Sequence, residues 1–196
     1  MQGLYSLLSV LVLALILSGC APRAVAQAEE IEAPADLPEK SNPTRFVQSE
    51  IVSTDAPADC PLTGPPDPPF TPPAPYSELG FEGGFWYGSD SLWTIISLNG
   101  IWAGLPRNPE GYTQKIFWWR DGYVWMEEPE PALTVTGERL DAAAPPLIAS
   151  KATNAYASDI GSAMLVGVDF PTLGCWKITG KYGDAELSFV VWVAPE

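Results

Sequence analysis

Residues 81–196 alternate short apolar segments with turn residues, and this pattern constrains the fold more than any other feature of the chain. Three dipeptides typical of two-residue hairpin loops interrupt it: Asn99-Gly100, Asp121-Gly122 and Gly183-Asp184. Further strands are expected at 133–137 and 163–169, and no stretch has the caps and periodicity of a three-turn helix. About eight short strands without connecting helices predict an all-β fold, a single antiparallel β-sandwich over residues 81–196.

The C-terminal hairpin has a defined register if Gly183-Asp184 is its loop. Tyr182 then pairs with Ala185, and alternation places one apolar set on a single face: Trp176, Ile178, Phe189, Val191 and Val193. The opposite face carries the polar set Lys177, Thr179, Lys181, Glu186 and Ser188. The segment Gly174-Cys175-Trp176-Lys177-Ile178-Thr179-Gly180, with the hairpin that follows it, resembles the closing strands of bacterial extracytoplasmic immunoglobulin-like domains. This resemblance implies a fold rather than an activity.

The first 20 residues combine an apolar segment with a small-residue cleavage signal. Residues 7–17 would make about 16 Å of helix, too short to cross a bilayer, and Ser18-Gly19-Cys20 follows at once. The stretch Leu17-Ser18-Gly19-Cys20 resembles the lipobox of bacterial lipoproteins, which implies a signal peptide over residues 1–19 and a lipid anchor, with palmitate, on Cys20. We therefore expect the chain outside the cytoplasm, anchored to the cell membrane or the outer membrane. The alternative is an uncleaved membrane helix, since no charged residue precedes Arg23.

Residues 20–80 have the composition of a linker. They contain 13 of the 21 prolines and none of the eight tryptophans, with ten acidic side chains against three basic ones. Such a segment buries too little apolar surface to offset its ordering entropy, which predicts a disordered or extended tether. Its last part, from Pro65 to Pro75, is expected to be a stiff polyproline-like spacer. The alternative for this part is a proline-rich ligand for the aromatic groove of a partner.

The net charge of −14 excludes two classes of partner. Nucleic acids and anionic lipid surfaces are bound through basic patches, and the sequence contains no basic cluster. We therefore expect no nucleic-acid partner, and a membrane contact only through the lipid on Cys20.

Two cysteines remain to pair with each other once Cys20 carries lipid. An oxidising compartment favours a Cys60–Cys175 disulfide, and in the hairpin register above Cys175 lies on the face of Lys177, away from the apolar set. This bond would pin the far end of the linker to the sheet. Two unpaired thiols, or an intermolecular bridge, are the alternatives.

The absence of histidine removes several kinds of catalytic site. Nucleophile systems that need a histidine base are excluded, as are zinc or copper sites that contain histidine. Two cysteines do not build a thiolate metal site, and no glycine-rich phosphate loop is present. We therefore predict no enzyme, no cofactor and no metal. The remaining enzymatic alternative is a small hydrolase that uses the carboxylates of Glu127, Glu128 and Glu130.

Residues 116–127 contain the most informative cluster of aromatic side chains. With Asp121-Gly122 as a type I′ loop, Trp118 pairs with Trp125, and alternation places Phe117, Trp119, Val124 and Met126 on a core face. The opposite face carries Trp118, Arg120, Tyr123, Trp125 and Glu127. One interpretation is a recognition platform, in which the indole rings stack on sugar or proline and Arg120 lies over Trp118. The other is a cross-strand aromatic pair covered by the proline-rich part of the linker.

These features predict a binding or interaction module at the cell envelope. The candidate ligand-binding residues are Trp118, Arg120, Tyr123 and Trp125, and the ligand is expected to be a glycan or a protein. The alternative from another class is a scaffold or accessory subunit that docks on an envelope protein complex.

Overall fold

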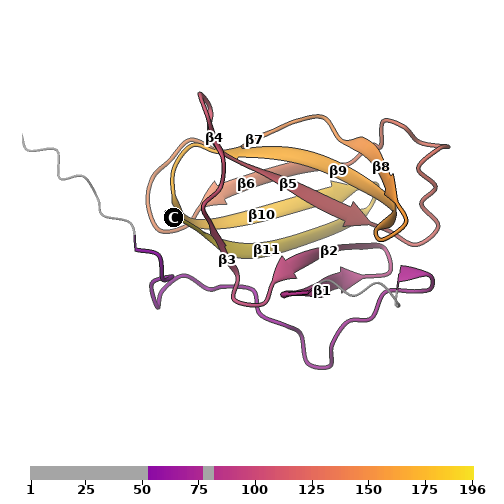
Figure 1. Cartoon of the computed structure of the whole chain (residues 1–196), viewed down its shortest axis with the longest axis horizontal. Helices are drawn as coiled ribbons and strands as arrows, with labels where there is room; N and C mark the ends of the chain where they lie inside the picture. Colours follow the sequence, from indigo (N-terminus) through magenta and orange to yellow (C-terminus); the bar gives the residue numbers. More distant parts are fainter. Residues whose placement is uncertain (1–52, 77–81) are drawn as a thin grey trace, which may run out of the picture. The chain divides into compact units, whose positions relative to one another are not determined.

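The computed structural model of the chain describes residues 53–76 and 82–196. This part contains eleven β-strands and no α-helix, and the strands form two sheets (Figure 1). The all-β sandwich that the alternating pattern predicts is therefore confirmed. The predicted signal peptide at 1–19, the predicted lipidation site Cys20 and the first part of the predicted linker lie outside the described residues.

The first sheet has the strand order β1-β2-β5-β9, with β4 beside β5 and with β7 and β8 beside β9. Its strands are β1 (Gly84–Ser89), β2 (Leu92–Ser97), β4 (Arg107–Asn108), β5 (Gly111–Trp119), β7 (Ile148–Ala149), β8 (Thr153–Ala157) and β9 (Gly161–Phe170). The second sheet has the order β3-β11-β10-β6. Its strands are β3 (Ile101–Ala103), β6 (Thr134–Arg139), β10 (Gly174–Tyr182) and β11 (Ala185–Ala194).

The β10–β11 hairpin has the register predicted from its two-residue loop. Tyr182 pairs with Ala185 and Trp176 with Val191. Every member of the predicted apolar set is at most 1% exposed. These side chains face the first sheet and form the core with residues of β5 and β9 such as Trp118, Val166 and Phe170.

The dipeptide Asn99-Gly100 does not close a hairpin, so this part of the prediction is wrong. It carries the chain from β2 in the first sheet to β3 in the second sheet. Gly100 has a φ of 65°, and its carbonyl accepts a hydrogen bond from the Trp192 N–H at 2.9 Å. This contact places β3 beside β11, and the two strands run parallel, in contrast to the purely antiparallel sheets that were predicted.

The dipeptide Asp121-Gly122 also fails to form the predicted hairpin. Gly122 does occupy a turn, with a φ of 70°, but β5 ends at Trp119 and residues 120–133 contain no strand. The reason is that β5 already has a partner on each side, with β2 and β4 on one and β9 on the other. Pro129 and Pro131 further oppose a returning strand because proline has no N–H to donate.

Residues 53–76, which we call the strap, pack against both sheets. Their first half covers the outer face of the second sheet, where Cys60 is buried with Cys175 and Trp192. Their second half covers the outer face of the first sheet, where Phe70 and Tyr76 contact the ring of Trp93. Figure 1 shows the strap in purple, passing along β1 and β2. Within the described residues, the strap therefore packs on the outer faces of both sheets.

Candidate functional site

The four predicted ligand residues do not share one exposed face. Trp118 is fully buried in the core, where its ring packs against Phe189 at 5.8 Å between centroids. Its strand neighbours are Thr94 and Met164 rather than Trp125. The predicted platform depended on the 116–127 hairpin, and it is absent because that hairpin does not form.

The other three predicted residues lie in the 120–133 loop. Tyr123 is buried and its hydroxyl donates to the Glu128 carbonyl at 2.9 Å. Arg120 lies over the ring of Tyr182, at 5.3 Å from the centroid, instead of over Trp118. Trp125 is half-buried and stacks on Tyr156 of β8. The predicted roof of proline-rich chain exists, but it covers Trp93 and not the Trp118–Trp125 pair.

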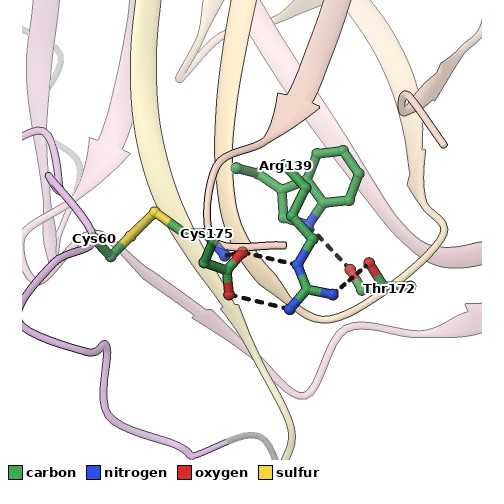
Figure 2. A network of polar contacts seen from close by, with 6 residues as sticks. Cys60, Arg139, Thr172 and Cys175 are labelled. Atoms are coloured by element: carbon green, nitrogen blue, oxygen red, sulfur yellow. Dashed lines mark hydrogen bonds and ion pairs between the residues drawn. A yellow bond between two sulfur atoms is a disulfide. The ribbon is translucent and has the colours of Figure 1, made fainter. Parts of the chain in front are cut away.

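The predicted disulfide is present. Cys60 and Cys175 are joined, with their Cα atoms 5.7 Å apart (Figure 2). The first half of the strap is held there by further bonds, since Thr63 exchanges hydrogen bonds with the backbone of Val190 at 2.8 and 3.0 Å. These bonds occupy a stretch of the β11 edge that β3 does not reach.

A polar network supports the strand end that carries Cys175. Arg139 makes a two-pronged ion pair with Asp141 at 2.8 and 3.1 Å, and it also donates to Thr172 (Figure 2). Asp141 in turn accepts the Cys175 N–H at 3.0 Å. Burial opposes ionisation of Asp141, but the hydrogen bonds from Arg139 and Cys175 outweigh it and lower the pKa of this carboxyl. The side chains of Arg139, Asp141 and Thr172 and the Cys175 N–H are hydrogen-bonded within this network. We therefore interpret it as a structural brace for the strand end that carries Cys175.

A crevice opens in the first sheet, because β2 and β5 pair over only two residues. Trp93 pairs with Trp119 and Thr94 with Trp118, and beyond this point the strands separate (Figure 1). Side chains replace the missing ladder bonds. The Thr94 hydroxyl donates to the Phe117 carbonyl at 2.7 Å, and the Lys115 N–H donates to the side-chain oxygen of Gln114 at 2.9 Å. The separation is therefore built into the sequence of the two strands.

The crevice has a volume of about 360 Å³, within the usual range for small-ligand sites of about 300–1,000 Å³. One wall comes from the β1–β2 side and the other from β5, with Trp102 of β3 also lining it. The lining residues are Glu82, Gly83, Gly84, Ile95, Ser97, Trp102, Gln114, Lys115, Ile116, Phe117 and Trp119.

Aromatic rings give the crevice stable apolar surfaces. Phe117 and Trp119 stack at 5.9 Å with 28° between their planes, and Trp86 meets the edge of Trp119 at 5.1 Å. Trp102 is fixed from behind by edge contacts with Phe170 and Phe189. Each ring is held by its neighbours, so a ligand would meet a preformed surface.

Polar groups lie beside these rings. Gln114 uses its oxygen for the Lys115 N–H, which leaves its amide N–H groups to donate to a ligand. Lys115 forms no ion pair within residues 53–76 and 82–196, and it is exposed at the crevice together with the carboxylate of Glu82. The crevice therefore offers hydrogen-bond donors and one charge of each sign beside an aromatic surface.

The sequence analysis missed the crevice because it depends on which strands become neighbours. One signal was available. Gln114 lies on the inward phase of β5, together with Ile116 and Trp118, where a core strand would carry an apolar side chain. A polar residue in the apolar phase of a strand indicates a place where the sheet does not close.

The carboxylates considered for hydrolysis lie outside the crevice, in the 120–133 loop. Glu127 and Glu130 are exposed, while Glu128 accepts the Tyr182 hydroxyl and the Ala132 N–H. Burial, followed by the charge of Glu128, raises the pKa of Tyr123 to about 12. Burial likewise raises the pKa of Tyr182, so both phenols stay protonated and can donate near neutral pH. In the part of the chain that the structure describes, no three His, Cys, Asp or Glu side chains are placed to hold a metal ion.

Comparisons with known proteins add no family to this picture: no protein-family model, curated protein or solved structure matches the chain. Among the described residues, no helix is long and apolar enough to span a membrane.

Proposed function

We propose that the chain is an extracytoplasmic, lipid-anchored binding module, and that the β2–β5 crevice holds a sugar unit of an envelope glycan. The crevice carries this proposal, because it combines a preformed aromatic surface with unused hydrogen-bond donors in a volume that suits a small ligand. No chemical step is part of the proposal.

A sugar suits the crevice better than a purely apolar or a strongly charged ligand. The C–H face of a pyranose ring packs on aromatic rings, here Phe117 and Trp119, while its hydroxyl groups need donors and acceptors at the rim. Gln114, Lys115 and Glu82 supply both kinds of group. The two opposite charges at the crevice, on Lys115 and Glu82, also disfavour a ligand with a large net charge.

Anchoring rests on the lipobox-like stretch that ends in Cys20. The test is mass spectrometry of the full chain produced in a bacterial host, with a Cys20→Ser variant as the control. The expected result is a mature chain that begins at Cys20 and carries diacylglyceryl and acyl groups, and a Cys20→Ser chain without lipid. An intact leader with an unmodified thiol would leave the chain as a membrane-helix protein and overturn this part of the proposal.

Binding is tested on the full chain in detergent micelles, by calorimetric titration with soluble amino-sugar oligosaccharides. Phe117→Ala removes a stacking ring and is expected to weaken binding by about two- to tenfold, in line with about 0.5–1.5 kcal/mol for an aromatic contact. Gln114→Ala removes two donors and is expected to weaken it by about fivefold. Trp125→Ala is the matched control, because it truncates an aromatic ring outside the crevice.

Two results would overturn the assignment. The first is the absence of binding to any oligosaccharide by the lipidated, folded chain. The second is binding that Trp125→Ala weakens while Phe117→Ala leaves it unchanged, which would place the ligand on the Trp125–Tyr156 pair instead.

A further inference from the structure

One end of the sandwich gathers four connections. They are the turn at 90–91, the loop at 120–133, the turn at 158–160 and the turn at 183–184, each at the end of paired strands. Hydrogen bonds join three of them in space, and the bond between Tyr182 and Glu128 brings in the turn at 183–184. The Asp121 N–H donates to the Asp90 carbonyl at 2.9 Å, and the Trp119 indole donates to the Ile160 carbonyl at 2.9 Å. We call this surface the loop end.

The loop end and the adjoining end of β8 expose large apolar side chains. Met126 is 70% exposed, Tyr156 59% and Val124 37%, and they account for three of the six large exposed hydrophobic side chains in the described residues. Trp125 lies between Val124 and Met126 in the chain and stacks on Tyr156, at 5.5 Å with 19° between the rings. These four residues form the apolar patch.

The loop that carries the apolar patch is fixed in place. Asn154 of β8 donates to the Trp125 carbonyl at 2.6 Å, and its own N–H donates to the Pro129 carbonyl at 3.1 Å. Glu128 is tied to Tyr182 of β10 by a hydrogen bond. A patch held by tertiary contacts loses little conformational freedom on docking, which favours its use as an interface.

Carboxylates are also exposed at the loop end. The four connections contain seven acidic residues and one basic residue, Arg120, which already lies over Tyr182 and donates to the Asp121 carbonyl. Six of the acidic residues are exposed: Asp90, Asp121, Glu127, Glu130, Asp159 and Asp184. The loop end therefore combines the apolar patch with an excess of exposed negative charge, although Lys151 lies near one of these residues, Glu130. We call the six exposed acidic residues the acidic rim.

We propose that the loop end docks a basic segment of a partner protein, one that places apolar side chains on the patch and Lys or Arg side chains on its acidic rim. Charge complementarity selects this occupant. An anionic lipid surface would be repelled by the rim, and so would a second copy of a chain with a net charge of −14.

The apolar patch is distinct from the crevice, because none of its four residues lines the crevice. The two surfaces meet at Trp119, whose ring lines the crevice and whose indole N–H donates to the Ile160 carbonyl at the loop end. Variants at Phe117 and Met126, which belong to one surface each, therefore test the two proposals separately. Phe117→Ala is expected to leave docking unchanged, so failure of one proposal does not imply failure of the other.

The probe is a labelled synthetic peptide in which Lys and Leu alternate, titrated by fluorescence anisotropy against the full chain in neutral detergent micelles. A Lys-Ser peptide and a Glu-Leu peptide of equal length serve as comparisons. The Lys-Leu peptide is expected to bind at least fivefold more tightly than the Lys-Ser peptide. The Glu-Leu peptide is expected not to bind, and added salt should weaken the Lys-Leu complex.

Two pairs of variants locate the contact. Met126→Ser is expected to weaken Lys-Leu binding by roughly fivefold, as for a residue near the centre of an interface. The control Leu98→Ser removes a hydrophobic side chain of similar exposure, 59%, that lies at the end of β2 away from the loop end. Glu127→Gln is expected to weaken binding by about threefold, and the control Glu110→Gln, in the turn between β4 and β5, should have no effect.

Several results would overturn the proposal. If the Lys-Leu and Lys-Ser peptides bind equally, the apolar patch does not contribute to binding. If Met126→Ser and Leu98→Ser have equal effects, binding is not located at the loop end. Dimerisation that Met126→Ser abolishes would identify a second copy as the occupant, and binding to anionic vesicles by the Cys20→Ser chain would identify a lipid surface.

Discussion

The β10–β11 hairpin and the β2–β5 pair are both antiparallel neighbours, yet one is closed and the other is open. Nine residue pairs join β10 to β11, and a disulfide and a strap cover their outer face. Only two residue pairs join β2 to β5, and the Thr94 and Gln114 side chains take over where the ladder stops. We infer from this difference that the closed region stabilises the fold, whereas the open region can form a ligand site.

The largest effect is expected at the disulfide that closes the first region. The Cys60–Cys175 bond spans 115 residues of sequence, and for a loop of this length chain entropy gives about 4–5 kcal/mol of stability. Removing both cysteines by Cys60→Ser with Cys175→Ser should therefore lower the urea midpoint strongly. Reductant should lower the midpoint of the parent chain and leave that of the double variant unchanged. Equal midpoints for parent and variant would show that the disulfide adds no stability to the closed region.

The second largest loss of stability is expected in the core, where the β10–β11 hairpin packs against β5. A Cβ atom on Gly180 would lie 2.4 Å from the buried ring of Trp118, so Gly180→Ala should destabilise the fold by about 1–3 kcal/mol. The matched control is Gly167→Ala in β9, where the nearest atom is the Ser150 hydroxyl at 3.6 Å. Urea unfolding measures both. A cost for Gly167→Ala as large as that for Gly180→Ala would contradict the described packing.

The third expected loss of stability is at Thr94, where β2 and β5 begin to separate. Thr94 is fully buried, and its hydroxyl is the partner of the Phe117 carbonyl. Thr94→Val should destabilise the fold by roughly 1–2 kcal/mol because it removes this hydrogen bond from a fully buried site. Thr94→Ser keeps the hydroxyl and should cost less, although it removes a methyl group. If the valine variant unfolds at the same urea concentration as the serine variant or a higher one, the hydroxyl does not support the separation of β2 from β5.

The smallest effect is a pH dependence in the brace of the closed region. The folded-state pKa of Asp141 lies below its ordinary value of about 3.9. Its contribution is therefore present above about pH 4 and is lost as the pH falls through the folded-state pKa. The stability difference between the parent chain and Asp141→Asn should be constant near neutral pH and shrink below about pH 4. A difference that grows on acidification would contradict the lowered pKa.

The two regions also differ in how far the sequence could predict them. The β10–β11 register followed from a two-residue loop and an alternation of apolar and polar side chains, which are local features. Asp121-Gly122 has the same local chemistry, but β5 finds its partners in β2 and β9, and no local pattern contains this information. The crevice and the loop end both arise from such distant pairings.

The strap is a second region whose contacts could not be predicted from local sequence. Its proline content and charge indicated an extended tether. Composition alone could not predict that Phe70 and Tyr76 contact Trp93 on the first sheet. The disulfide was predictable because cysteine pairing follows from compartment and count. The proposed crevice residues were not predictable in this way. The expected 116–127 hairpin places Phe117 on the core face, and the position of Gln114 is informative only once the partners of β5 are known.

The most direct test of the central claim is an NMR titration of the full chain with an amino-sugar oligosaccharide, followed through the indole N–H resonances. The chain has eight tryptophans, and two of them, Trp102 and Trp119, line the crevice. The expected result is saturable shifts of these two resonances, lost in Phe117→Ala, while the Trp125 resonance stays in place. Shifts confined to Trp125, or no saturable shift at any tryptophan, would contradict the proposal that the open region is the ligand site.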